Sequence, residues 1–162
     1  MLTGVEVLCH SSIKINKHLV MYIDPYKIKN ETHDADIIFC THAHYDHFSE
    51  EDIEKVRGIN TILVITEDCY TKAMKLGFNE DRIFIVEPNQ NYELLGIKFE
   101  TVPSYNIEKQ YHPKENGWVG YILEVDNIRY YIAGDTDLTP EVKNVKCDVA
   151  LVPIRRKVYN ER

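Results

Sequence analysis

The sequence predicts an α/β domain that holds either one mixed sheet or two packed sheets. In the first half, apolar runs rich in β-forming residues alternate with helix-like segments, as in parallel strands joined by crossovers. In the second half, paired apolar runs flank short turns, as in antiparallel hairpins. The 162 residues contain no repeat, linker or low-complexity segment. We therefore expect residues 1–162 to form a single domain.

The first half is expected to hold five strands and two helices. Ser49 lies three residues before Asp52, which resembles a capping box and predicts a helix to about Val56 that ends near Gly58. Gly77 occupies the usual position after the end of a second helix. The strands are predicted at Val5–Cys9, Ile13–Ile15, His18–Ile23, Asp36–Thr41 and Thr61–Thr66, and the second helix at Glu67–Leu76.

The second half is expected to hold two hairpins and a last strand. The turns are predicted at Gly96 and at Asp126-Asn127, a favourable two-residue turn. The flanking strands are Tyr92–Leu95 with Ile97–Val102, and Trp118–Val125 with Ile128–Ala133; the last strand is Cys147–Pro153. The polar stretch Pro103–Gly117 between the hairpins is too long for a tight turn and is expected to be a functional loop.

The composition disfavours several classes of partner. Nineteen lysines and arginines stand against 26 aspartates and glutamates, a net charge of −7, so nonspecific binding to nucleic acid is not expected. No apolar stretch approaches the ~20 residues that span a bilayer, and the start of the chain lacks the features of a signal peptide. Cys9, Cys40, Cys69 and Cys147 form no CxxC pair and are interpreted as small buried hydrophobes in a reducing cytosol. We therefore expect a cytoplasmic protein that does not contact a membrane.

The densest chemical signal is the run THAHYDH directly after the predicted strand Asp36–Thr41. Residues i and i+2 of an extended segment face the same way, so His42 and His44 can converge on one ion. As the chain turns, Asp46 and His47 can face a neighbouring ion. Imidazole and carboxylate ligands suit zinc, and also iron or manganese. The alternative, a solvated histidine-rich loop, does not account for four potential ligands at this spacing.

This run resembles the HxHxDH signature of the metallo-β-lactamase-fold hydrolases. Tyr22–Pro25 resembles the aspartate-containing strand end of that superfamily, and Ala133–Asp137 resembles its later GDT motif. From Cys9–Ser12 through Gly117–Tyr121, the chain is most similar to the small ascorbate-phosphate-lactonase-like branch, whose members are predicted metal-dependent hydrolases. The resemblance covers nearly the whole chain and implies an αββα sandwich with mixed sheets.

The resemblance also implies roles for single residues. In the family, the first two histidines of the motif, here His42 and His44, bind one metal. Asp46 and His47 correspond to ligands of a second metal, and Asp135 to a carboxylate that bridges both. One or two zinc ions are therefore expected, with iron or manganese as alternatives. Without the resemblance, a turn cap is as good an interpretation of Asp135, although the glycine before it would permit close backbone approach.

The remaining histidines and Asp137 have less direct links to the metal site. Where the family usually places a third histidine, this chain has Ser104–Asn106, so His112 in the following loop is predicted as that ligand; an exposed loop histidine is the alternative. His10 could line the site, but a structural hydrogen-bonding role is favoured. Asp137 is interpreted as a cap for the segment at Thr139-Pro140. His18 and His33 are interpreted as surface or turn residues.

The resemblance is incomplete at the end of the chain. The family continues past a strand like Cys147–Pro153, and a later histidine completes its second metal site. Here no histidine follows His112, and the chain stops at Arg162. We therefore expect the fold to lack its final C-terminal elements and the second metal to lack one ligand. An uncovered sheet edge or face would be a natural surface for homo-oligomerisation.

The leading functional hypothesis is a metal-dependent hydrolase acting on a small-molecule substrate. Metal-activated water would cleave an ester, lactone or phosphoester, and Asp46 would orient the water and accept its proton. The alternative is a truncated, catalytically impaired metal-binding remnant that persists as an oligomer. A redox di-iron protein and a nuclease are ranked below both, since the chain has no flavin domain and no basic patch.

Overall fold

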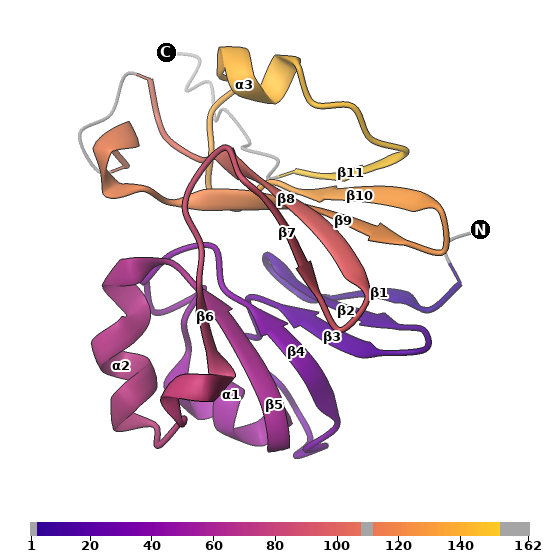
Figure 1. Ribbon diagram of the computed structural model, residues 1–162, viewed down its shortest axis with the longest axis vertical. Helices are drawn as coiled ribbons and strands as arrows, with labels where there is room; N and C mark the ends of the chain where they lie inside the picture. Colours follow the sequence, from indigo (N-terminus) through magenta and orange to yellow (C-terminus); the bar gives the residue numbers. More distant parts are fainter. Residues whose placement is uncertain (1–2, 108–111, 153–162) are drawn as a thin grey trace, which may run out of the picture.

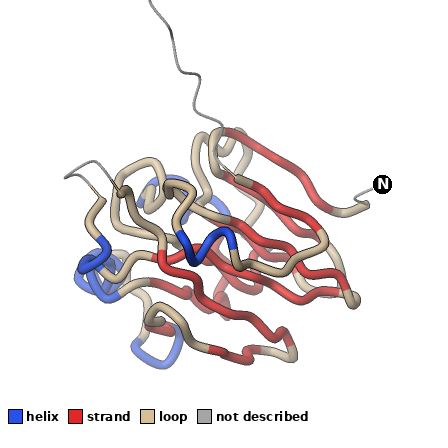
Figure 2. Tube along the Cα trace, turned by 90° about the horizontal axis from the view of Figure 1, so that it is seen from above, coloured by secondary structure: helices blue, strands red, loops and turns tan. Residues whose placement is uncertain are grey.

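Two β-sheets packed face to face form the centre of the molecule, and helices lie on the outer side of each sheet (Figure 1). The computed structural model describes residues 3–107 and 112–152. Most of the described chain is strand and loop (Figure 2). The predicted α/β sandwich with mixed sheets is confirmed.

The first sheet has six strands in the order β1-β2-β3-β4-β5-β6. The first three are antiparallel. The last three continue parallel to β3, which confirms the parallel arrangement that the alternation of strands and helices predicted. The strands are β1 (Val5–Cys9), β2 (Ser12–Asn16), β3 (Val20–Ile23), β4 (Ala35–Phe39), β5 (Arg57–Ile65) and β6 (Ile83–Ile85). The prediction missed β6, because three residues at a sheet edge are too few to show a strand pattern.

The second sheet has five strands in the order β11-β10-β9-β8-β7 and is antiparallel except for the β10–β11 pair. The strands are β7 (Asn91–Leu94), β8 (Ile97–Pro103), β9 (Val119–Val125), β10 (Ile128–Ile132) and β11 (Val149–Leu151). Asp126 and Asn127, with φ of 51° and 62°, make the predicted turn between β9 and β10. Two consecutive left-handed residues match the twist of the flanking strands, which explains the register of this hairpin.

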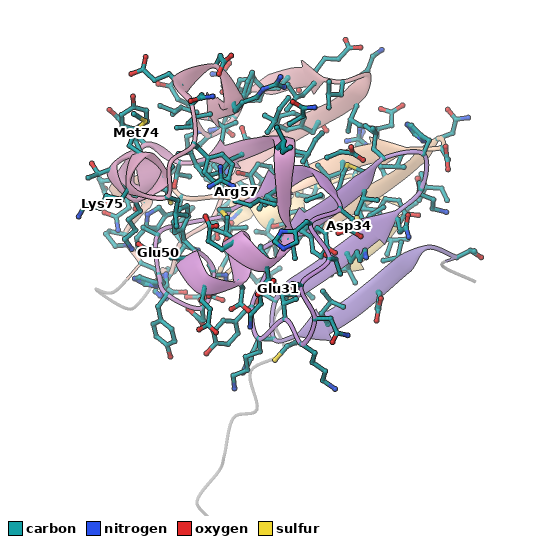
Figure 3. The ribbon with its side chains drawn as sticks, turned by 90° about the horizontal axis from the view of Figure 1, so that it is seen from below. Glu31, Asp34, Glu50, Arg57, Met74 and Lys75 are labelled. Carbon is teal, nitrogen blue, oxygen red and sulfur yellow. The ribbon has the colours of Figure 1, made fainter. Side chains whose placement is uncertain are left out.

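The helices are short. They are α1 (Glu50–Val56), α2 (Tyr70–Lys75) and α3 (Pro140–Lys143), with 3₁₀ turns at η1 (Glu67–Cys69), η2 (Glu80–Arg82) and η3 (Lys114–Asn116). Ser49 caps α1 by accepting a hydrogen bond from the Asp52 amide, which confirms the predicted start. The second predicted helix divides into η1 and α2. Figure 3 views the α1–α2 layer from below, with Glu50 labelled on α1 and Met74 on α2.

Asp137 does not cap α3, so that prediction is wrong. The side chain of Thr139 caps α3 by accepting the Val142 amide, while Asp137 accepts the amide of Ile107 at 2.9 Å. A threonine directly before a proline at the first helical turn is the better-placed cap. Asp137 instead ties the loop after β8 to the loop after β10.

The main core lies between the sheets and joins apolar side chains from both of them, such as Phe39 of β4 and Tyr121 of β9. A second core lies between the first sheet and α1–α2, and a small third core lies under α3. Cys40 and Cys69 are buried as predicted, but Cys9 and Cys147 are only half-buried, which corrects the prediction for those two. Within the described ranges, no helix has the length and apolarity to cross a membrane.

Candidate metal centre

Three loops carry the predicted ligands, and each loop follows a strand. The loop after β4 carries His42, His44, Asp46 and His47, and the short segment after β10 carries Asp135. The long loop between β8 and β9 carries His112. Because β4 belongs to the first sheet and β8–β10 to the second, the site forms only where the two sheets face each other.

Four of these residues form one cluster. His42, His44, His112 and Asp135 each offer a ligand atom, and these atoms lie within 4.8 Å of one another. The ring centroids of His42 and His44 are 4.7 Å apart, and those of His44 and His112 are 4.9 Å apart. The structure therefore brings together the residues predicted for the first metal, His112 of the long loop among them.

Asp46, His47 and Asp135 form a second, adjoining cluster. The Nε2 atom of His47 lies 3.0 Å from Oδ2 of Asp135 and 3.5 Å from Oδ2 of Asp46. Asp135 belongs to both clusters, which is the position that the resemblance gave to a bridging carboxylate. Among the described residues this second cluster has three donors, one fewer than the first.

His42 has the chemistry of a ligand. Its side chain is buried, and its Nδ1 lies 2.9 Å from Oγ1 of Thr41, so the ring can donate there. Its other nitrogen, Nε2, is buried and has no hydrogen-bond partner in the part of the chain that the structure describes. Burial, followed by the nearby positive charge of His47, lowers the pKa of His42 to about 2. A neutral imidazole with a free lone pair is the form that binds a metal.

Asp24 holds His47 in place. It is fully buried at the end of β3 and accepts hydrogen bonds from the Thr41 amide at 2.8 Å, the Thr41 hydroxyl at 2.7 Å and His47 Nδ1 at 2.7 Å. His47 Nε2 is thereby directed at Asp135. Burial opposes a charge on His47, but Asp24 and Asp135 outweigh it and raise the pKa of His47 to about 10. Binding of a metal at Nε2 therefore requires release of a proton.

Asp135 stays ionised beside His47. Burial alone would raise the pKa of this carboxyl, but the hydrogen bond and charge of His47 lower it to about 2. Gly134 before it has φ of 66°, and a Cβ atom there would lie 3.1 Å from Cβ of Thr41. The glycine thus lets the chain that carries Asp135 pack closely against the chain that carries the histidines, as expected from its position.

Trp118 is a residue of the site to which the sequence analysis gave no role. It is 7% exposed and directly precedes β9, and its ring centroid lies 4.8 Å from those of His42 and His44 and 5.0 Å from that of His112. Its Nε1 donates to Oδ2 of Asp68 at 2.7 Å. Two features of the sequence could have indicated a role for Trp118: it is the single tryptophan, and it directly follows the polar loop.

The other histidines lie outside the clusters. His10 is exposed in the β1–β2 turn and contacts the ring of Tyr26, with 5.5 Å between centroids. The predicted structural hydrogen bond of His10 is absent among the described residues, because the turn directs the ring to the surface. His10 instead lines a recess of about 310 Å³ with Gly134 and Leu151. His18 and His33 lie at the surface, as predicted.

Residues 5–162 match the family model of the β-lactamase superfamily domain. This chain belongs to that superfamily. A metal-dependent hydrolase of the UPF0173 group from Methanosphaera stadtmanae is 28% identical over 170 residues, which cover 94% of this chain and 72% of the relative. The UPF0173 metal-dependent hydrolase of Korarchaeum cryptofilum is 31% identical over 168 residues, which cover 93% and 69%.

A solved structure of similar sequence agrees with the fold. The crystal structure of a protein from Parabacteroides distasonis, described as a candidate metal-dependent hydrolase, has a TM-score of 0.77 and 28% identity, covering 94% of this chain and 70% of that one. This member of the β-lactamase superfamily is thus similar to metal-dependent hydrolases in sequence and structure. None of these relatives is named as a lactonase, so the narrower resemblance to the ascorbate-phosphate-lactonase-like branch stays a prediction.

Proposed function

We propose that this chain is a metal-dependent hydrolase that cleaves an ester, lactone or phosphoester bond of a small-molecule substrate. The observation that carries the proposal is the buried Nε2 of His42, which has no hydrogen-bond partner in the described part of the chain. A buried polar atom left unsatisfied costs about 1–3 kcal/mol. His44, His112 and Asp135 offer ligand atoms within 4.8 Å, so a cation would satisfy this nitrogen.

The donor set favours zinc among the available ions. Three imidazoles with one carboxylate suit Zn²⁺, while iron or manganese also accept these ligands. A divalent ion supplies Lewis acidity, since it polarises an electrophile and lowers the pKa of a coordinated water toward ~7. His42, His44, His112 and Asp135 would hold the first ion; Asp46, His47 and Asp135 would hold a second.

Residues next to the proposed ions would orient the water and hold the ligands. Asp46 is half-buried and reaches the second cluster, where it would orient the attacking water and accept a proton from it. Asp24 keeps His47 directed at Asp135. The ring of Trp118 packs against the rings of all three histidines of the first cluster.

Metal content and hydrolysis together test the proposal. Purified protein should contain one or two equivalents of zinc by elemental mass spectrometry, and His42→Ala and His44→Ala should each lose the ion of the first cluster. His18→Ala, at the surface, is the matched control and should keep it. The metal-loaded wild type should hydrolyse at least one of a nitrophenyl ester, a simple lactone and bis-nitrophenyl phosphate, and a chelator should abolish that activity. Full metal content in His42→Ala would contradict the site.

A second candidate is a metal-binding protein without catalysis, and the three-donor second cluster favours it. In that case the zinc content would be close to one equivalent, and none of the three substrates would be hydrolysed above the His42→Ala background. Homo-oligomerisation and a cytoplasmic location stay predictions from the sequence.

A further inference from the structure

The indole of Trp118 lies against three of the four candidate ligands of the first cluster. It is tilted by 33° to the ring of His42 and nearly perpendicular to the rings of His44 and His112, at 70° and 72°. All three centroid distances are 4.8–5.0 Å. One rigid side chain therefore limits the ring rotation of three imidazoles at once.

A contact from the other sheet holds the indole. Trp118 directly precedes β9 of the second sheet, whereas Asp68 lies in η1, which follows β5 of the first sheet after Thr66. Nε1 of Trp118 donates to Oδ2 of Asp68 at 2.7 Å, and Oδ1 of Asp68 accepts from the Thr66 hydroxyl at 2.6 Å. The bond from Thr66 orients the Asp68 carboxylate independently of Trp118, so Asp68 can anchor the Nε1 edge of the indole.

We propose that Trp118 is a positioning residue for the metal ligands and that Asp68 acts through it. The inference rests on the proposed metal site. Imidazoles that are already oriented lose less freedom when an ion binds, so metal affinity should depend on the indole. Groups that orient metal ligands without touching the metal typically account for about 10–100-fold in affinity. We expect an effect of this size from the Trp118–Asp68 pair.

Tryptophan fluorescence reports on this site alone, because Trp118 is the single tryptophan of the chain. Titration of the metal-free protein with Co²⁺ should quench the tryptophan fluorescence in step with the growth of the visible Co²⁺ absorption bands. Quenching that fails to accompany cobalt binding would overturn the placement of Trp118 beside the ligands.

Zinc affinity of variants tests the positioning role. Trp118→Phe keeps an aromatic ring but removes the Nε1–H donor, and Asp68→Ala removes the acceptor. Each should weaken Zn²⁺ binding by about 10–100-fold in a chelator competition assay and should alter the Co²⁺ absorption spectrum. The double variant should be little weaker than either single one, because both remove the same contact. Glu67→Ala, at an exposed position of the same 3₁₀ turn, is the control and should bind zinc like the wild type.

Thermal unfolding of the metal-free variants separates positioning from general damage. Trp118→Phe should keep the melting temperature of the metal-free wild type within a few degrees while losing zinc affinity. Unchanged zinc affinity in both Trp118→Phe and Asp68→Ala would overturn the proposal while leaving the metal site intact. A wild-type chain that binds neither Zn²⁺ nor Co²⁺ would overturn the metal site itself, and the role of Trp118 with it.

Discussion

At the scale of single residues, the hydrogen bonds behind the site converge on Asp24. Its carboxylate is fully buried and is the acceptor for His47 Nδ1 and for both the amide and the hydroxyl of Thr41. Asp24→Ala leaves these three donors without their acceptor and leaves His47 paired only through Nε2, with Asp135 and Asp46. Removal of one partner of a buried ion pair costs ~3–5 kcal/mol. We expect a loss of this size in the free energy of unfolding, measured with urea.

Glu51→Ala provides the comparison for Asp24. The side chain of Glu51 is 82% exposed and pairs only with Lys55 at 3.4 Å among the described residues, so its loss should change the free energy of unfolding by less than ~1 kcal/mol. If Asp24→Ala were no more harmful than Glu51→Ala, the buried hydrogen bonds would not support the site as described.

The residues differ in how far the sequence alone predicted them. His42, His44, Asp46 and His47 are close in sequence; the i, i+2 spacing of the two histidines predicted one shared ion, and the turn after them predicted that Asp46 and His47 face a neighbouring ion. Asp135 needed the resemblance, because a carboxylate after a strand is equally typical of a turn. The contact between Trp118 and Asp68 spans 50 positions and two sheets. No local pattern predicts it, since it depends on how the sheets face each other.

At the scale of elements, the loop that carries His112 is fastened to α3 through Glu141. The carboxylate of Glu141 accepts from the Tyr105 hydroxyl at 2.7 Å and from Lys114 Nζ at 2.8 Å. The hydrogen bond from Lys114, and then that from Tyr105, lowers the pKa of Glu141 to about 2. The folded pKa lies below the ordinary value of 4.5, so this contribution to stability is complete above about pH 4.5 and is lost as the pH falls toward 2.

Glu141→Gln should therefore flatten the acid side of the stability profile. Between pH 5 and pH 2, the free energy of unfolding should fall less steeply in the variant than in the wild type, because glutamine has no proton to bind in this range. Glu93→Gln changes an exposed carboxylate of β7 and should keep the wild-type slope. Equal slopes in all three proteins would show that Glu141 does not hold the loop through its charge.

The segment after β10 passes so close to the loop after β4 that a side chain at Gly134 would be crowded against Thr41. Gly134→Ala imposes a residue with φ of 66° and a Cβ atom 3.1 Å from Cβ of Thr41. Gly77 after α2 has φ of 83°, but a Cβ atom there would meet nothing within 4 Å, so Gly77→Ala isolates the conformational cost of about 1–2 kcal/mol. We expect Gly134→Ala to lower the free energy of unfolding by more than Gly77→Ala and to weaken zinc binding, which Gly77→Ala should not. Equal effects of the two substitutions in urea unfolding would contradict the close approach.

Elements were predictable where local chemistry determines them. Ser49 marks the start of α1, and Asp126-Asn127 marks the β9–β10 turn, because capping and left-handed backbone are properties of a few adjacent residues. The strand β6 was missed, and Asp137 was assigned to the wrong loop contact, because pairing with β5 and the bond to Ile107 depend on neighbours distant in the chain.

At the scale of the whole molecule, the site is a junction between the two sheets. The loop after β4 comes from the first sheet, while Asp135 and His112 come from the second. Behind the site, the hydroxyl of the buried Tyr121 on β9 crosses the core and donates to the carbonyl of Cys40 at 2.7 Å. An ion bound by the first cluster would thus join loops of the two sheets, which the core already holds face to face.

Metal binding should therefore stabilise the entire fold rather than one loop. A ligand that binds only the folded chain adds about 2.7 kcal/mol at a free concentration of 100 times its Kd. In a domain of this size, each kcal/mol raises Tm by roughly 2–4 °C, so zinc at that concentration should raise Tm by roughly 5–11 °C. The transition should stay single in calorimetry, because the ligands come from both sheets. His42→Ala should lose most of the shift and His18→Ala should keep it. Two separate transitions, only one of them responsive to zinc, would mean that the sheets unfold independently and that the site does not join them.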